Sequence, residues 1–372
     1  MGGRARTQAE EELRYAWVDV AKGICILLVV MMHSTLGTGE AMGGEGFLHP
    51  VVAFAKPFRI PDFFLLSGLF VGRVLDRDWR RFADRRIIHF AYFYLLWLLL
   101  QSALKYETVA GDGGIPAFLA HLALALVEPY STLWFIYLLA VFSIVTKLLR
   151  PLPGPALLGT AALLQIMPVQ TSSFLVEEFC ARYVYFVGGY LLADQIFAFS
   201  DAVRRYRRLA LASLGAWALA EGWLAFTPSG IPDHPTLASL PGVGLAAGFA
   251  GALAIVALAS LLAEAGGVVT GALRTCGKRS IVIYLAFFLP MAAWRSLIVK
   301  TGVIEDVGLA SLAVMSVAVV LPLLFERLIR GTWLGFLFRR PRVLHLTGTR
   351  SGEAALTTPL TGSRVIERQA RG

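Results

Sequence analysis

The sequence contains no asparagine and only three cysteines among its 372 residues. Without asparagine there is no acceptor site for N-linked glycosylation. Cys25, Cys180 and Cys276 stand singly, so their spacing indicates neither a disulfide framework nor a zinc site. No histidine–carboxylate pair has metal-ligand spacing, and the GxSxG and P-loop motifs are absent. We therefore expect no metal site and no bound cofactor.

Charged residues are also scarce: they make up 16% of the chain, against 57% hydrophobic residues and a mean hydropathy of +0.67. Apolar runs close to the ~18–20 residues that span a bilayer recur along the sequence, which predicts a polytopic membrane protein. The net charge of +9 comes from basic residues clustered in short loops between these runs. This distribution follows the positive-inside rule and argues against a nucleic-acid partner.

The fold class predicted from these runs is all-α: a polytopic transmembrane helical bundle of about ten helices, with both termini in the cytoplasm. The expected spans cover residues 17–36, 47–71, 87–103, 132–149, a short helix ending near residue 168, and then 179–197, 209–226, 237–263, 281–299 and 307–328. Around the membrane domain at 14–330, we expect a cytoplasmic N-terminal segment at 1–13 and a basic, partly disordered cytoplasmic tail at 331–372.

The first span carries three ionisable residues, Asp19, Lys22 and His33. At ~100° per residue, the step from Lys22 to His33 makes about three helical turns, so both side chains point the same way, roughly 16 Å apart along the axis. Asp19 falls on the same stripe. Such residues usually face a bundle interior or a wet cavity. The alternative is a snorkelling Lys22 and an interior His33 with structural hydrogen bonds.

Later spans add further ionisable side chains at membrane depth: Arg59, Asp62, Glu178, Arg182, Glu221 and Arg295. Asp62 follows Pro61 in an interrupted span, which favours a cavity-lining role because broken helices must be buried or line a cavity. The i,i+4 spacing of Glu178 and Arg182 favours a structural ion pair. For Glu221, a position near the outer interface is as good an interpretation as a functional one.

Five stretches in order resemble the acyltransferase-3 family of integral membrane acyltransferases. Lys22 and His33, with ten residues between them, match its Arg/Lys-x10-His motif. The other matches are PDFFLLSG at 61–68, the basic loop through Arg85 and Arg86, LWF at 133–135, and the G-x-x-S-x-x-x-Y stretch at 277–284. The resemblance spans residues 14–330. Asp62 departs from the family pattern, because that position is usually apolar.

The resemblance implies transfer of an acyl group, often acetyl, from cytoplasmic acyl-CoA to a hydroxyl of a glycan, lipid-linked or other extracytoplasmic acceptor. It places such a multi-pass protein in the bacterial inner membrane. The catalytic residues expected are His33 as general base, Lys22 assisting the anionic donor, and Asp19 orienting Lys22. The substrate-binding residues expected are Arg59, Asp62, Ser67, Arg85, Arg86 and Trp134. Direct transfer and a transient acyl-histidine both stay open.

Two other function classes fit a polytopic bundle with intramembrane charges. A secondary transporter or flippase of a lipid-linked sugar or small metabolite would use broken helices at its binding site. Against it, the two halves of the chain have no corresponding broken segments, and the motif of the first span occurs once. A sensor or scaffold without chemistry poorly explains three aligned polar residues in one span.

Overall fold

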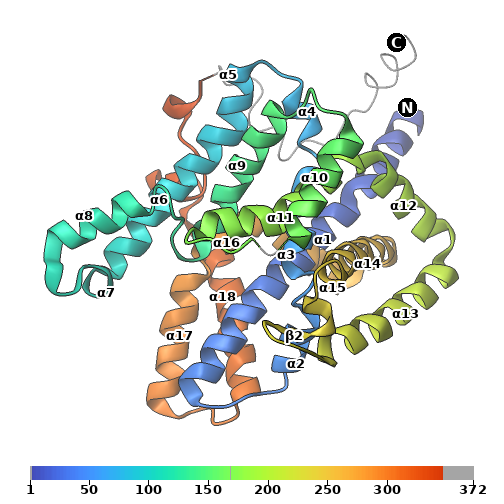
Figure 1. Cartoon of the computed structure of the whole chain (residues 1–372). Helices are drawn as coiled ribbons and strands as arrows, with labels where there is room; N and C mark the ends of the chain where they lie inside the picture. The colour runs from blue at the N-terminus through green and yellow to red at the C-terminus, as the bar shows by residue number, and fades with distance from the viewer. Residues whose placement is uncertain (1, 168, 347–372) are drawn as a thin grey trace.

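The computed structural model describes residues 2–167 and 169–346, and within them it confirms the all-α class (Figure 1). The helices in chain order are α1 (Gly2–Met42), α2 (His49–Ala55), α3 (Arg59–Gly68), α4 (Gly72–Leu75), α5 (Trp79–Phe82), α6 (His89–Leu104), α7 (Tyr106–Ala110), α8 (Gly114–Leu124), α9 (Trp134–Leu148), α10 (Gly154–Ile166), α11 (Phe174–Leu191), α12 (Ala193–Arg205), α13 (Arg207–Phe226), α14 (Val243–Ala265), α15 (Gly267–Lys278), α16 (Ser280–Ala286), α17 (Phe288–Thr301) and α18 (Val307–Ile329). A π-helical segment, Ala83–Ile88, joins α5 to α6, and a hairpin pairs β1 (Pro228–Ile231) antiparallel with β2 (His234–Thr236).

Over the described residues, six helical segments are long and apolar enough to cross a membrane, and the bent pair α16–α17 would make a seventh. These seven coincide with seven of the ten spans that the sequence predicts. The other three correspond to α2–α3, which a break divides, to α10 and to α11. With 13 residues, α10 is about 20 Å long and shorter than a bilayer core. Charged residues at 177, 178 and 182 lower the hydropathy of α11.

The bend of 52° between α16 and α17 has a local cause in the sequence. Pro290 lies in the first turn of α17, where its missing N–H removes no hydrogen bond. Its ring is incompatible with a straight helix that continues from α16, because it would clash with the carbonyl group four residues earlier. The break leaves the fully buried Phe287 between the two helices. It therefore turns this side chain towards the centre of the bundle.

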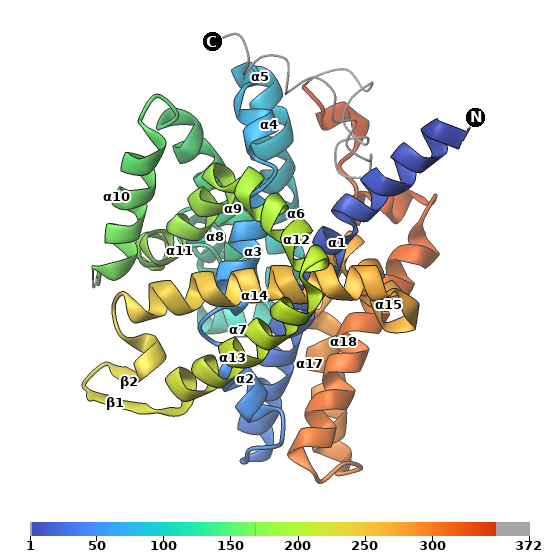
Figure 2. The same ribbon diagram turned by 90° about the vertical axis from the view of Figure 1, so that its right-hand side faces the viewer.

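Helix α1 occupies that centre. Its residues Val20, Ala21, Cys25, Ile26 and Val30 are 0% exposed. Helices α3, α14, α15 and α18 pack around it, and Figure 2 shows α14 and α15 running across α1 rather than alongside it. Small residues permit such close crossings.

The contact between α15 and α1 is made by backbone at Gly277. A Cβ atom there would meet the carbonyl oxygen of Asp19, whereas Gly271 on the same helix faces open space. We expect Gly277→Ala to lower the free energy of unfolding by about 1–3 kcal/mol, because one helix must shift. Gly271→Ala should leave stability unchanged or raise it by about 0.5–1 kcal/mol. Thermal unfolding in one detergent, followed by tryptophan fluorescence, compares them; equal melting temperatures would contradict the close approach.

The chain beyond α18 returns to pack along α6 and the π-helical segment. The indole N–H of Trp97 donates to the carbonyl of Leu337 at 3.0 Å. The Arg340 guanidinium lies 2.7 Å from the Asp84 carboxylate, both side chains being 5% exposed, and the Leu346 amide donates to the same carboxylate at 2.9 Å. The first part of the predicted tail is thus tied to the bundle, whereas residues 347–372 lie outside the described residues.

Candidate functional site

Helix α3 packs on α1, and one electrostatic interaction and one ring contact place the two helices antiparallel. At one end, the charge of Arg59 acts on His33; at the other, the Lys22 Nζ atom lies 5.5 Å from the centre of the Phe70 ring. Lys22 and His33 are eleven residues apart, and so are Arg59 and Phe70. Eleven residues of helix are roughly 16 Å long. The sequence motifs in the first span and around residue 65 therefore face each other along their length.

The start of α3 explains how a proline sits at this depth. Pro61 is the third residue of the helix, where backbone N–H groups have no intrahelical partner, so its missing N–H removes no bond. The Asp62 amide donates to the Phe58 carbonyl at 2.9 Å and closes the first turn. This turn presents Arg59 and Asp62 on one face of α3, since they are three residues apart.

At the Lys22 end, three cations gather around Phe70. Besides Lys22, the Arg73 guanidinium carbon lies 5.8 Å from the Phe70 ring centre, and an Arg86 nitrogen donates to the Phe70 carbonyl at 3.4 Å. Asp19 lies one turn from Lys22, and each acts on the other's charge. Lys22, Arg73 and Arg86 together form a positively charged site suited to phosphate groups. We call it the cationic cluster.

Arg85, the other basic residue expected to bind substrate, is half-buried and close to the charges of Arg77, Asp84 and Arg81. Neighbours in a helix point about 100° apart, so Arg85 and Arg86 face different surroundings. The structure brings only Arg86 of this pair to Lys22. Arg73 also belongs to the cationic cluster. The sequence did not indicate this, because Arg73 is one of several basic residues in the same loop.

At the other end, the His33 ring centre lies 5.4 Å from that of Phe287. Among the residues that the structure describes, His33 has no hydrogen-bond partner on the protein. The hydroxyls of Ser34, Thr35 and Thr38 are also buried without a protein partner. One turn beyond His33, a Cβ atom on Gly37 would meet the Arg295 guanidinium. The imidazole thus packs against Phe287, with the Arg295 guanidinium one turn away and no protein partner for its ring nitrogens among the described residues.

Three matched stretches meet in an aromatic cluster on α3. The ring centres of Phe64 and Phe135 are 4.6 Å apart, and those of Phe135 and Tyr284 5.7 Å apart. The Tyr284 hydroxyl donates to the Thr132 carbonyl. The Trp134 ring lies 6.2 Å from Phe64. These contacts fix α9 and α16 against α3.

Ser67, also expected to bind substrate, donates its hydroxyl hydrogen to the Phe63 carbonyl at 2.7 Å within the same helix. Beyond it, a Cβ atom on Gly68 would meet the Phe186 carbonyl, and one on Gly189 the Leu65 carbonyl. In this structure Ser67 and Gly68 therefore allow the close packing of α3 on α11. Trp134 belongs to the aromatic cluster.

The predicted pair of Glu178 and Arg182 forms an ion pair at 3.1 Å, as the i,i+4 spacing favoured. Glu221 is 2% exposed and faces the bundle. Asp62 is 1% exposed, and its charge acts on Cys25 of α1, between the levels of Lys22 and His33. The charge of Glu221 acts in turn on Asp62. Two buried carboxylates thus lie beside the path from Lys22 to His33.

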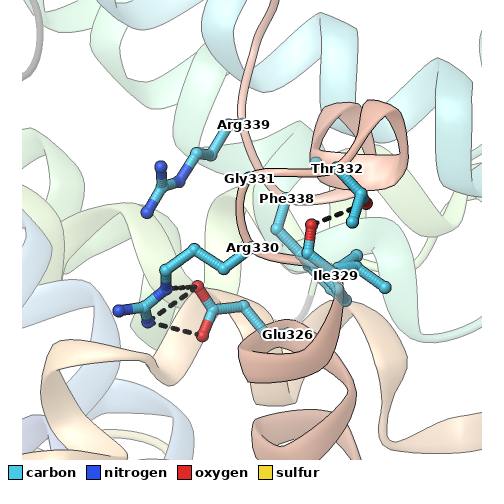
Figure 3. Close-up of a pocket in the computed structure, with 8 residues that line it drawn as sticks. Glu326, Ile329, Arg330, Gly331, Thr332, Phe338 and Arg339 are labelled. Atoms are coloured by element: carbon cyan, nitrogen blue, oxygen red, sulfur yellow. Dashed lines mark hydrogen bonds and ion pairs between the residues drawn. The ribbon is translucent and has the colours of Figure 1, made fainter.

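A surface pocket of about 190 Å³ lies where α18 ends (Figure 3). Figure 3 shows Arg330 pairing with both carboxylate oxygens of Glu326, at 2.9 and 3.0 Å. Glu326 also meets Arg279, 3.3 Å away, which follows α15. Because Glu326 neutralises much of this charge, the pocket is less suited to anions than the cationic cluster is. Over the described ranges, no three His, Cys, Asp or Glu side chains gather as a metal site.

Comparison with known proteins agrees with the arrangement of these motifs. The model of the acyltransferase-3 family, described as an acyltransferase domain, matches residues 15–327. A curated relative, the inner membrane protein YcfT of Escherichia coli (strain K12), is 26% identical over 164 residues, which cover 37% of this chain and 45% of that protein. No solved structure matches the chain. With its multiple apolar helices, the chain is a multi-pass membrane protein that belongs to the acyltransferase-3 family.

Proposed function

We propose that the protein transfers an acyl group, most simply acetyl, from acyl-CoA to a hydroxyl group of an extracytoplasmic glycan or lipid-linked acceptor. The observation that carries this proposal is the packing of α3 on α1, which places the cationic cluster and His33 roughly 16 Å apart along the contact between the two helices. We call the line between them the path. The phosphates of CoA meet the cations at one end. The pantetheine arm follows the path and brings the thioester to His33.

The chemical step uses His33 as general base. The imidazole takes the proton of the acceptor hydroxyl while that oxygen attacks the thioester carbonyl carbon. The carbon–sulfur bond then breaks, and the imidazolium returns its proton to the departing CoA sulfur. Arg59, whose charge acts on His33, stabilises the negative charge that develops on the thioester oxygen. Asp19 orients Lys22 in the cationic cluster.

The location proposed is the bacterial inner membrane, with the donor site open to the cytoplasm. Basic residues at 73, 77, 80, 81, 85 and 86 lie at the Lys22 end of the path, and such clusters stay on the cytoplasmic side. The printed name of the E. coli relative, an inner membrane protein, is consistent with this location.

The test is acyl transfer by the full-length protein in lipid vesicles supplied with radiolabelled acetyl-CoA. The acceptor is the envelope glycan fraction extracted from cells that lack the gene. We expect alkali-labile label in that fraction, and mass spectrometry of glycans from wild-type and deletion cells should show the corresponding acyl increment. Uptake of solutes into the vesicles without any turnover of acetyl-CoA would contradict the proposal and favour a transporter.

A further inference from the structure

A second polar site lies where the first turn of α3 faces the buried stripe of α13. We infer that Asp62, Glu221 and Trp217 form a subsite that binds a neutral, polyhydroxylated sugar ring of the acceptor. The inference rests on the proposed function, because it assigns the substrate class of the same site. It adds Trp217 and Glu221, on a helix that none of the matched motifs reaches.

Two pairs of residues with i,i+4 spacing form the site. Phe58 and Asp62 share one turn of α3, and Trp217 and Glu221 share one turn of α13. The aromatic members touch, with ring centres 5.3 Å apart, and Phe54 packs 5.7 Å from Trp217. One turn along, Asp62 is close enough to Glu221 to feel its charge. The aromatic contacts thus bring the two carboxylates within electrostatic range of each other.

Helix α13 presents a single narrow face to the bundle. Its exposed residues include Leu219, 79% exposed, and Trp223, 63% exposed. The face of α13 that packs against the rest of the bundle is a stripe of buried or half-buried residues at 210, 214, 217, 221 and 225. Apolar side chains would suffice to pack such a stripe, so a carboxylate there needs another explanation. Burying a charge without a partner is strongly unfavourable.

Neither carboxylate is satisfied by the protein. Both oxygens of Asp62, the Oε1 atom of Glu221 and the Trp217 indole N–H are buried and lack a hydrogen-bond partner in the part of the chain that the structure describes. The same holds for two guanidinium nitrogens of Arg59. Each unsatisfied buried group costs about 1–3 kcal/mol. A ligand that supplies hydrogen bonds to several of them would recover this free energy on binding.

The mixture of groups specifies the chemistry of that ligand. Carboxylate oxygens accept hydrogen bonds from hydroxyl groups, whereas the guanidinium of Arg59 and the indole N–H of Trp217 donate to hydroxyl and ring oxygens. A sugar ring carries both kinds of partner on adjacent carbons. An anionic group is disfavoured beside two carboxylates. The charge of Arg59 also acts on His33, so a sugar ring that binds Arg59 would place a neighbouring hydroxyl towards the imidazole.

The experiment measures acyl transfer from acetyl-CoA to the envelope glycan fraction by full-length Trp217→Phe, Glu221→Gln and Asp62→Asn variants in vesicles. We expect the acceptor concentration for half-maximal transfer to rise about tenfold or more in the two carboxylate variants, the cost of one weakened hydrogen bond to a charged group, and about threefold to tenfold in Trp217→Phe, which loses a bond between neutral groups. The acetyl-CoA concentration for half-maximal transfer should change less than about twofold, since the cationic cluster is intact. Trp223→Phe on the exposed face of α13 and Glu264→Gln at the exposed end of α14 are the matched controls.

Each outcome decides between the two proposals. If wild-type protein transfers no acyl group and turns over no acetyl-CoA, the proposed function itself fails. If wild-type protein transfers and the three variants match their controls, the sugar subsite is wrong while the function stands. Equal effects on the donor and acceptor concentrations, in a variant that elutes as the folded protein, would also overturn the subsite. Trp217→Phe keeps an aromatic ring against Phe58 but lacks the indole N–H. It therefore tests the hydrogen bond to the sugar even if the carboxylate variants fail to fold.

Discussion

Replacing His33 with alanine is expected to reduce acyl transfer by a factor of about 10²–10⁴, the usual contribution of a positioned general base. The loss follows because His33 is the single histidine of α1, the helix that also carries Lys22. Transfer of radiolabelled acetyl from acetyl-CoA to the envelope glycan fraction, in vesicles of equal protein content, measures it.

The matched control for this change is His234→Ala. His234 belongs to the β-hairpin, where its ring nitrogen lies 2.8 Å from the Ser239 carbonyl oxygen. This variant should retain transfer close to the wild-type rate. A His33→Ala protein that elutes and melts as wild type but still transfers acyl groups at an undiminished rate would refute the role of His33.

Replacing Lys22 with alanine is expected to act on the donor. Loss of one charge-assisted contact to a phosphate should raise the acetyl-CoA concentration for half-maximal rate by about tenfold to a hundredfold. Dependence on acceptor concentration should change much less, because His33 and Arg59 lie about three helical turns away. Rates measured over a series of acetyl-CoA concentrations at saturating acceptor give this number.

Two further variants sharpen the result for Lys22. Lys22→Arg keeps the positive charge beside Phe70 and should recover most of the affinity for acetyl-CoA. Lys56→Ala removes an exposed lysine from the segment between α2 and α3 and should have no effect. Unchanged dependence on acetyl-CoA in Lys22→Ala would remove Lys22 from the donor site.

Much of the fold followed from the apolar runs. Seven of the ten expected spans reappear as long apolar helices or as the bent pair. The remaining three depart from a simple span because of particular residues: a break around Pro57, the short length of α10, and the charges at the start of α11. The segment after α6 forms the short helix α7, because its polar residues are compatible with a helical turn.

Periodicity within one helix also predicted the common stripe of Asp19, Lys22 and His33, since it needs only the pitch of α1. It left unknown which other helix faces that stripe. Arg59 and Phe70 reach it because α3 runs antiparallel in matching register, a relation between two helices separated by a loop. Likewise, the sequence gives no reason to prefer Arg85 or Arg86 as a donor-binding residue, because both lie in the same basic stretch. The π-helical segment points them in different directions, and only Arg86 reaches Phe70.

The sequence by itself determined that this chain is an all-α membrane protein and that its first span carries an ionisable stripe, because hydropathy and helical pitch are local properties. Only the tertiary structure decided that Glu221 is buried within electrostatic range of Asp62. The physical reason is that the two residues belong to helices far apart in the chain. Their meeting depends on how Phe58 and Trp217 pack, which no single-helix pattern encodes.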